Sequence, residues 1–452
     1  MQQGTQTNKK QKMKKLKFTN ALAIALSASL FLVSCSDKDT ATPNPEGGGE
    51  LENNATLTGD ISKNTTLVKG NTYFLKGGVH VVGGAVLTIE EGVTVKSDPT
   101  DGSVAYLLID PNSKIEAVGT AEAPIVFTSG KANPAAQDWG GLILTGKAPI
   151  NVQGSGGTAA SEMGQGISYG GTDANHSSGT LKYVRVEYTG KVATSEKEHN
   201  GFTFEGVGAG TTVEHIAVYH GGDDGIEFFG GTVNVKYAVV YGAQDDSFDW
   251  TYGWKGKGQF WVAIQGDILA DRGIEADNNG SNKTSTPYSE PMLSNVTLVG
   301  SLIAKTGDDL ESNPESGKTR AIKLREGTKG KLYNFVSYGF SSGVEVEHDE
   351  TLANVEDGSL IFANSSVYGP KSWSFKKTDG SSFTGPKSFN QVGDNIADET
   401  VKPSFITDKY VGTTTSTFDP KTLDGWFDSA QYQGAVSTSD NWVAKGTWAK
   451  TN

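Results

Sequence analysis

The segment GGDDGIEFFGG, residues 221–231, combines the residue types that acid–base and cation chemistry use. Asp223 and Asp224 are adjacent in it, and Glu227 follows between large apolar side chains. Carboxylates gathered in this way bind hard cations such as Ca²⁺, or act as general acids and bases. The alternative is that the segment is one unit of a repeating scaffold that directs its charges outward.

The same pattern returns after 22 residues, because VEHIAVYHGGDDGIEFFGG (213–231) aligns with VKYAVVYGAQDDSFDWTYG (235–253). Two pairs of aspartates correspond in this alignment: Asp223 with Asp245, and Asp224 with Asp246. Further copies of one half of the pattern or the other lie at 181–190, 200–206, 272–278, 293–300, 320–326, 332–339 and 342–348. The chain therefore contains an internal repeat, which has to be interpreted before any single motif.

A repeat of this length fits one coil of a parallel β-helix, in which three short strands and three turns alternate. No such coil buries its apolar face alone, so the coils must stack. Glycine supplies 58 of the 452 residues, and short Val/Ile/Phe/Tyr runs lie between the glycines, which is typical of many short strands and turns. The sequence predicts an all-β fold: a right-handed parallel β-helix, or solenoid, with coils of about 22 residues.

Stacking the coils arranges residues that lie far apart in the chain into columns. In GIEFF, Ile226 and Phe228 point inward and Glu227 points outward, because side chains alternate along a strand. The column just before this strand contains Asn200, Asp224, Asp246, Arg272, Arg320 and Ser342. The outward column on the strand contains Thr203, Glu227, Asp249, Glu275, Lys323 and Glu345.

Like charges that face each other across neighbouring strands are unfavourable, and Glu227, Asp249 and Glu275 form such a stack. Three explanations are open: water screens the charges, a hard cation such as Ca²⁺ binds, or one carboxyl has a raised pKa and takes part in catalysis. The candidate metal ligands are Asp224, Glu227, Asp246 and Asp249. The candidate catalytic residues are Asp223, Asp224, Asp245, Asp246 and Arg272.

Segments of variable length join the two halves of each coil, and the alignment places them all at one corner. They are residues 189–199, 220–223, 242–245 and 301–319. The acids of this corner are Glu196, Glu198, Asp223, Asp245, Asp308, Asp309 and Glu311. Variable loops on a rigid scaffold commonly carry binding sites, so we expect a binding surface here.

Tyr252 and Trp254 follow the acidic positions of one coil, at the start of a Gly/Lys-rich turn. An exposed ring beside carboxylates suits a sugar, whose CH face stacks on the ring while its hydroxyls hydrogen-bond to the acids. The alternative is that both rings pack under their own loop. The candidate binding residues are Glu227, Asp249, Glu275, Tyr252 and Trp254.

The first 34 residues have the composition of a signal peptide. Six lysines between positions 9 and 17 precede the apolar run Ala21–Val33, which is shorter than the roughly 20 residues that span a bilayer as a helix. The polar, Pro- and Gly-containing stretch up to residue 55 is expected to be a flexible tether.

The sequence Leu32-Val33-Ser34-Cys35 resembles the lipobox of bacterial lipoproteins, and Cys35 is the single cysteine of the chain. This resemblance implies that Cys35 is lipidated and begins the mature protein. The acidic stretch SDKD (36–39) resembles the export signal of Bacteroidota lipoproteins. The resemblance implies a protein anchored in the outer membrane and facing the cell exterior, with a body that stays in water.

The N-terminal coils contain GGAVLTIEEG (83–92), AVGTAEAPIVFTSG (117–130) and WGGLILTGKAPI (139–150). These segments resemble a signature of cell-surface parallel β-helix proteins with a pectate-lyase-like fold, and 432–448 resembles the closing segment of many Bacteroidota lipoproteins. We expect four parts of the chain: signal peptide 1–34, lipidated cysteine and tether 35–55, parallel β-helix 56–425 and C-terminal cap 426–452.

The wider fold family includes polysaccharide lyases, which use Ca²⁺-binding acids and a nearby Arg or Lys; Arg272 and Arg320 lie in the acidic columns. A glycoside hydrolase instead needs two carboxylates about 5–9 Å apart. The resemblance alone does not decide between these activities and none, because this fold also forms adhesins and other binding proteins.

The net charge of the chain excludes nucleic acid as a partner. All 52 acidic residues but only 33 of the 39 basic ones follow position 34, so the mature chain has a net charge near −19 and repels nucleic acid. We expect a non-enzymatic surface lipoprotein that binds glycan or an outer-membrane partner through the acidic edge, with Ca²⁺ as the candidate cofactor. The alternative is a polysaccharide lyase or glycoside hydrolase.

Overall fold

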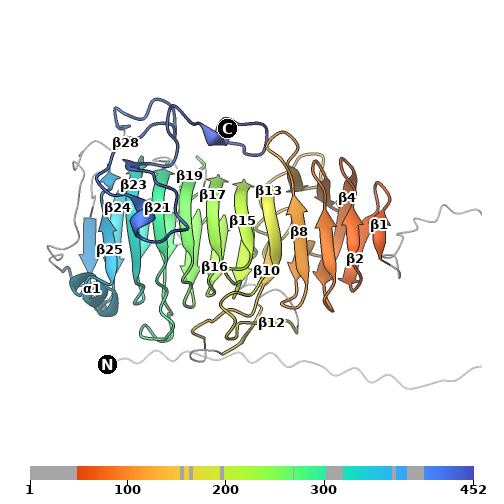
Figure 1. Cartoon of the computed structure of the whole chain (residues 1–452), viewed down its shortest axis with the longest axis horizontal. Helices are drawn as coiled ribbons and strands as arrows, with labels where there is room; N and C mark the ends of the chain where they lie inside the picture. Colours follow the sequence, from red (N-terminus) through yellow and green to blue (C-terminus); the bar gives the residue numbers. More distant parts are fainter. Residues whose placement is uncertain are drawn as a thin grey trace, which may run out of the picture. The chain divides into compact units, whose positions relative to one another are not determined.

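The computed structural model describes residues 48–152, 157–161, 166–193, 198–267, 269–301, 319–368, 373–383 and 402–452. All of them belong to one compact unit, Ala41–Asn452. Twenty-five strands of this unit pair side by side into one sheet, and every pair within it is parallel (Figure 1). The predicted parallel β-helix is confirmed.

Three rows of strands wind around the solenoid. The first row contains β1 (Gly49–Leu51), β3 (Thr65–Leu67), β5 (Val86–Ile89), β8 (Lys114–Val118), the first halves of the long strands β13 (Gly179–Glu187), β15 (Thr212–Tyr219), β17 (Asn234–Tyr241), β19 (Lys257–Ile264), β21 (Met292–Val299) and β23 (Gly330–Tyr338), and β25 (Leu360–Ala363). The second row contains the first halves of β2 (Thr56–Ile61) and β4 (Thr72–Val81), then β6 (Thr94–Ser97), β9 (Ile125–Thr128), the second halves of the long strands and β26 (Ser366–Val367).

The third row contains the acidic positions. It begins with the second halves of β2 and β4 and continues through β7 (Tyr106–Ile109), β10 (Leu142–Thr145), β14 (Phe202–Glu205), β16 (Ile226–Phe229), β18 (Phe248–Thr251), β20 (Arg272–Ala276), β22 (Arg320–Leu324), β24 (Ser342–Glu347) and β27 (Trp373–Lys376). Its register confirms the predicted outward column, because Glu227 pairs with Asp249, which pairs with Glu275. Apolar side chains of the same strands point inward and stack, as Phe204 does on Phe228 with 5.3 Å between ring centroids.

Each long strand bends once, between its two halves, at a residue in the left-handed backbone region. Non-glycine residues adopt this region at a cost of roughly 1–2 kcal/mol, so its repetition marks a built corner. The residues of this bend column, with their φ angles, are Tyr183 (51°), His215 (55°), Tyr237 (63°), Phe260 (61°), Asn295 (57°) and Asn334 (62°).

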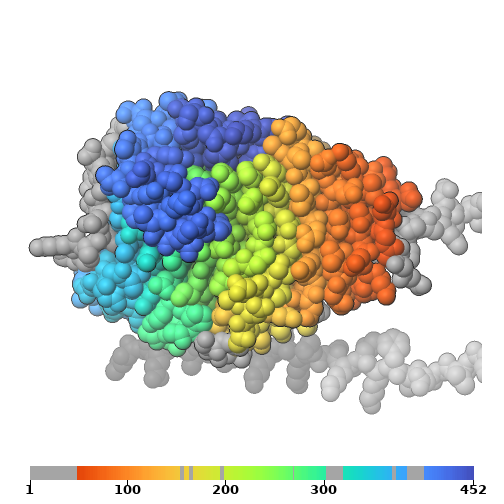
Figure 2. All heavy atoms as spheres, in the orientation of Figure 1, coloured from red at the N-terminus to blue at the C-terminus, as the bar shows by residue number. Residues whose placement is uncertain are grey.

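The final segment, 402–452, covers the bend column. It contains β28 (Thr414–Thr415) and β29 (Tyr432–Gln433), which pair antiparallel, and two short 3₁₀ turns, Pro420–Thr422 and Trp442–Ala444. Figure 1 and Figure 2 show this segment in dark blue, crossing over several coils. Near its end Arg185 Nη1 donates to the carbonyl of Trp448 at 2.9 Å, and the Thr447 amide donates to the carbonyl of Ala121 at 2.7 Å.

Two predicted boundaries are therefore wrong. The segment predicted to cap the solenoid (426–452) lies along its side instead, and it belongs with residues from 402 onward. Structure also begins inside the predicted tether, because β1 pairs with β3 from Gly49. The short helix α1 (Asp349–Glu356) packs beside β24 and β25 near the other end of the sheet, and β11 (Ala159–Ala160) and β12 (Ser168–Tyr169) form a small separate hairpin.

The predicted signal peptide 1–34, Cys35 and the first part of the tether lie outside the described residues. Within the described residues, no helix is both long enough and apolar enough to cross a membrane.

Candidate functional site

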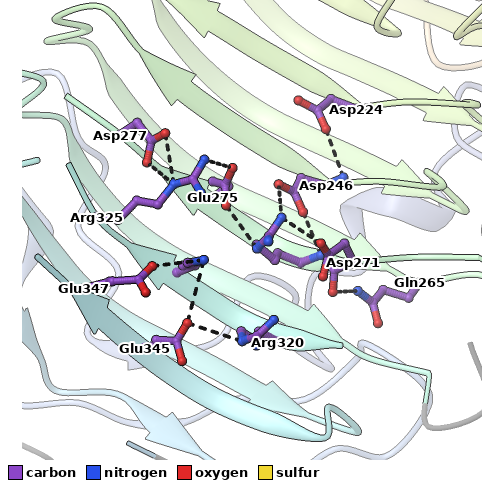
Figure 3. A network of polar contacts seen from close by, with 12 residues as sticks. Asp224, Asp246, Gln265, Asp271, Glu275, Asp277, Arg320, Arg325, Glu345 and Glu347 are labelled. Carbon is purple, nitrogen blue, oxygen red and sulfur yellow. Dashed lines mark hydrogen bonds and ion pairs between the residues drawn. The ribbon is translucent and has the colours of Figure 1, made fainter. Parts of the chain in front are cut away.

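Asp224 and Asp246 lie at the corner that leads into the third row of strands, and both are buried. Asp224 Oδ1 accepts a hydrogen bond from the Asp246 amide at 2.9 Å, and Asp246 Oδ1 accepts one from the Arg272 amide at 2.7 Å (Figure 3). Each aspartate thus ties its own coil to the next. This part of the repeated motif has a structural role, as the scaffold interpretation predicted.

A cavity of about 240 Å³ opens beside this corner. Its walls include Asp223 and Asp245 from two successive coils, with Asp271, Arg272 and Glu198. The structure therefore brings together the candidate catalytic residues that the alignment assigned to one place. Four other acids predicted at this corner, Glu196, Asp308, Asp309 and Glu311, lie outside the described residues.

The carboxylates of the corner and of the outward column lie close enough to share a cation. Within each of four triads the ligand oxygens are all within 4.8 Å of one another. The triads are Asp223–Asp224–Asp245, Asp224–Glu227–Asp249, Asp245–Asp246–Asp271 and Asp246–Asp249–Glu275. All four predicted metal ligands belong to these triads, and oxygen donors at this density are what Ca²⁺ takes.

Asp249 belongs to two of these triads, as Asp224, Asp245 and Asp246 also do. Its Oδ1 is shielded from solvent and has no hydrogen-bond partner within the part of the chain that the structure describes. A buried carboxylate oxygen without a partner costs free energy on the order of 1–3 kcal/mol. Arg272 and Arg325 contact the neighbouring Glu275, but among the described residues no lysine or arginine forms an ion pair with Asp249 itself, and a divalent cation would supply that charge.

The pKa shifts of these carboxyls also indicate that a positive charge is missing. Burial, followed by repulsion from Asp223 and other acids, raises the pKa of Asp224 well above its ordinary range. Burial, followed by repulsion from Glu227 and Glu275, does the same to the pKa of Asp249. The physical cause is that several carboxylates near one another in a poorly hydrated place cannot all be ionised without a counter-charge.

Arg272 is already occupied by three acids. Its Nη1 lies 2.7 Å from Asp271 Oδ2 and 3.4 Å from Asp246 Oδ2, and its Nε lies 3.0 Å from Glu275 Oε1. Burial by itself would lower the pKa of Arg272, but Asp246, Glu275 and Asp271 outweigh burial and raise it above its ordinary value. A guanidinium held in this way keeps its proton, so Arg272 is a counter-ion of the cluster rather than a base.

The same column continues into a stretch where every acid has a cation (Figure 3). Glu345 Oε2 lies 2.6 Å from Lys376 Nζ, and Glu345 Oε1 lies 3.5 Å from Arg320 Nε. Burial raises the pKa of Glu345, but the hydrogen bond from Lys376 and the charge of Arg320 outweigh burial and leave the pKa below its ordinary value. Arg325 connects the two stretches, since it contacts both Glu275 and Asp277.

The predicted aromatic platform is wrong for Trp254. Its ring is 0% exposed, is stacked on Phe228 with 4.0 Å between centroids, and donates through Nε1 to the carbonyl of Val233. Tyr252 is half-buried, packs near Phe229 at 5.9 Å, and follows the opposite end of β18 from Asp246. Neither ring therefore stands beside the carboxylates as a surface for sugar.

The sequence did not reveal a second aromatic surface, which the rings of the bend column form. Tyr183, His215 and Tyr237 occupy the bend column, and their rings stack with 4.3 Å between successive centroids. The signal was in the alignment, which pairs His215 with Tyr237. An aromatic residue recurring just before the second half of each strand needs a corner, because strand alternation alone gives it no reason to be there.

Comparison with known proteins gives one match. A family model described as a pectate-lyase like beta helix domain matches residues 59–413. Neither the curated proteins nor the solved structures include a match for the chain.

Proposed function

We propose that this chain, which belongs to the pectate-lyase-like β-helix family, is a cell-surface protein that binds extracellular polysaccharide. It would contact its ligand through a divalent cation, Ca²⁺, held by the carboxylate triads. The observation that carries the proposal is the buried Oδ1 of Asp249, which has neither a hydrogen bond nor an ion pair among the described residues. Glu345 Oε1 also has no hydrogen bond, but Arg320 lies 3.5 Å from it. Asp224, Glu227, Asp246 and Asp249 would hold the cation. The fold alone would not support this assignment.

A bridging cation fits the charge of the chain. The mature protein has a net charge near −19, so it repels anionic polymers unless a cation neutralises the contact surface. Ca²⁺ takes six to eight oxygen ligands, and a cluster of carboxylates rarely fills all of these positions. The remaining positions would accept carboxylate or hydroxyl oxygens of an acidic polysaccharide.

Binding is favoured over lyase chemistry because the available arginine is not a base. A lyase must remove a proton from the sugar, and Arg272 is saturated by Asp246, Asp271 and Glu275. A glycoside hydrolase is the second candidate. The raised pKa of Asp224 favours it, because a raised pKa is the direction that a carboxyl acting as a general acid requires.

Attachment to the outer membrane is part of the proposal. The lipobox-like sequence that ends at Cys35 would supply the lipid, and the polar residues up to the start of β1 at Gly49 would separate the solenoid from the bilayer. A single lipidated residue holds a water-soluble body at a membrane without changing its fold.

The test uses the purified protein and a panel of neutral and acidic polysaccharides, with Ca²⁺ or with EDTA. Binding is measured by affinity electrophoresis, and the same samples are assayed for new reducing ends and unsaturated products. We expect retention by an acidic polymer in Ca²⁺ only, without product, and loss of retention in Asp249→Asn. The matched control is Glu345→Gln, which removes a carboxylate of the same column that already has its cations.

Product release from any polymer would replace the binding proposal by the enzyme. Retention that is equal in Ca²⁺ and EDTA, or equal in the parent and Asp249→Asn, would remove the cation from it.

A further inference from the structure

A second cavity, of about 720 Å³, lies where the final segment crosses the bend column. One wall comes from Tyr183, His215 and Tyr237, and the facing wall comes from Trp442 and Lys445 of the final segment. This place is distinct from the carboxylate corner, because the second halves of the long strands separate the bend from that corner. Its volume is in the range of small-ligand sites, which span roughly 300–1,000 Å³.

The aromatic wall is the end of a stack. His215 lies between Tyr183 and Tyr237, with 4.3 Å between centroids on each side, and Phe260 continues the stack beyond Tyr237 at 5.0 Å. The stack ends at Tyr183, because the preceding coil has the loop 119–124 (GTAEAP) at this level, and that loop contains no aromatic residue. The loop residues Gly119 to Glu122 line the cavity together with Tyr183.

Both lysines that line the cavity are paired with acids, and Glu122 is a further acid of the lining. Lys182 lies 3.4 Å from Glu214, and Lys445 lies 2.6 Å from Asp440. An anionic ligand would have to displace these carboxylates, and a cationic ligand would have to displace the ammonium groups. A neutral ligand rich in hydroxyls can donate to the acids and accept from the lysines without breaking either pair.

His215 supplies a third polar group. Its Nδ1 is buried and has no hydrogen-bond partner among the described residues. Burial, and then the charges of Lys182 and Lys445, lower the pKa of His215 to about 4, so the ring is neutral at pH 7. A neutral imidazole can donate from one nitrogen and accept at the other, which suits a hydroxyl group better than an ion.

We propose that this cavity binds a neutral sugar unit, with its CH face against Tyr183 and its hydroxyls toward Lys182, His215 and the Lys445–Asp440 pair. The site needs neither a cation nor the carboxylate triads, so it is independent of the function proposed above. It gives the final segment a role in recognition as well as in covering the solenoid.

The test is calorimetric titration of the purified protein, in EDTA, with the neutral disaccharides maltose, cellobiose, lactose and N,N′-diacetylchitobiose up to about 10 mM, where millimolar affinities are still measurable. We expect saturable binding of at least one of them. Tyr183→Leu and Lys445→Met should each weaken it about tenfold, which corresponds to about 1.4 kcal/mol. Lys445 is 62% exposed, so its variant cannot fail merely because the protein does not fold.

The matched control is Tyr241→Leu. Tyr241 belongs to the same wall of the solenoid and stacks on Tyr219 at 5.5 Å, but it does not line the cavity. Parent-like affinity in this variant is expected. The proposal is overturned if no disaccharide binds saturably, if Tyr183→Leu and Lys445→Met both bind as the parent does, or if glucuronic acid binds more tightly than every neutral sugar.

Discussion

The outward column contains two stretches whose strands pair in the same way but whose carboxyl pKa values shift in opposite directions. Glu227 and Asp249 on β16 and β18 pair in register, as Lys323 and Glu345 do on β22 and β24. In the downstream stretch Lys376 and Arg320 contact Glu345, and the pKa of Glu345 is lowered although burial opposes this. In the upstream stretch burial and neighbouring acids raise the pKa of Asp249.

This difference shows that the fold can form with acids that are all paired with lysine or arginine. A solenoid column can be neutralised by its own lysines and arginines, and the downstream coils show that this chain does so (Figure 3). The upstream carboxylates without such partners are what a site that takes its positive charge from a bound cation would contain.

The largest expected effect comes from Arg272, the counter-ion at the border of the two stretches. Arg272→Met leaves Asp246, Asp271 and Glu275 buried without it, which should lower the free energy of unfolding by about 3–5 kcal/mol. Arg320→Met is the matched control, because that side chain is 26% exposed and contacts Glu345 at 3.5 Å, so about 1 kcal/mol or less is expected. Urea unfolding in EDTA measures both, and equal losses would contradict the assignment.

Calcium removal should be the next largest effect. A cation that binds only the folded protein stabilises it by about 2.7 kcal/mol at a concentration 100 times its Kd. The melting temperature should therefore fall when EDTA replaces Ca²⁺, and Asp249→Asn should abolish the difference while Glu345→Gln preserves it. A calcium-dependent shift that survives in Asp249→Asn would place the cation elsewhere.

The contributions of the two stretches to folding stability should also change with pH in opposite directions. Groups with a raised pKa, such as Asp224 and Asp249, keep protons that the unfolded chain releases, so in EDTA their contribution to stability is lost as the pH rises through the raised values. Asp277 acts in the same direction, because burial raises its pKa from 3.8 to about 7 against the effect of Arg325. Glu345, with a lowered pKa, contributes above its ordinary value of 4.5 and loses this contribution as the pH falls.

Unfolding free energies measured across this pH range check the sign. Asp249→Asn should flatten the decline toward neutral pH, and Glu345→Gln should flatten the decline toward acid. Parallel profiles of the parent and both variants would show that the two carboxyls do not differ.

The smallest expected effect is a change in stability at pH 7 whose sign differs between the variants Asp249→Asn and Glu345→Gln. At pH 7 in EDTA, Asp249→Asn removes a carboxyl that burial and neighbouring acids penalise and should raise stability by about 1 kcal/mol, whereas Glu345→Gln removes one that Lys376 and Arg320 contact and should lower it by about the same amount. Both residues occupy the same column, so backbone and strand position are matched. Denaturant midpoints with a shared slope are sufficient to compare them.

The sequence predicted the fold and both columns, because the 22-residue repeat fixes the register and alternation fixes which side chains point outward. Glu227, Asp249 and Glu275 follow from that argument alone. Partners outside the repeat did not follow from it. Arg185 contacts the backbone of Trp448, 263 positions away, and no periodic pattern connects the two.

Trp254 shows the other limit of the sequence. A Gly/Lys-rich turn suggested an exposed ring, yet the core of this coil has room for an indole between Phe228 and Trp261, with centroids 4.0 and 6.2 Å away. Whether a large side chain enters a core depends on the volume that neighbouring coils leave, and turn composition does not report this volume. The bend column was overlooked for a related reason, since its left-handed backbone is a property of the stacked coils.

Calorimetric titration of the purified protein with CaCl₂ after EDTA treatment measures whether a cation completes the carboxylate cluster at Asp249. We expect saturable binding in the parent and in Glu345→Gln, and its loss in Asp249→Asn. An unchanged isotherm in Asp249→Asn, or no binding by the parent at millimolar Ca²⁺, would contradict it.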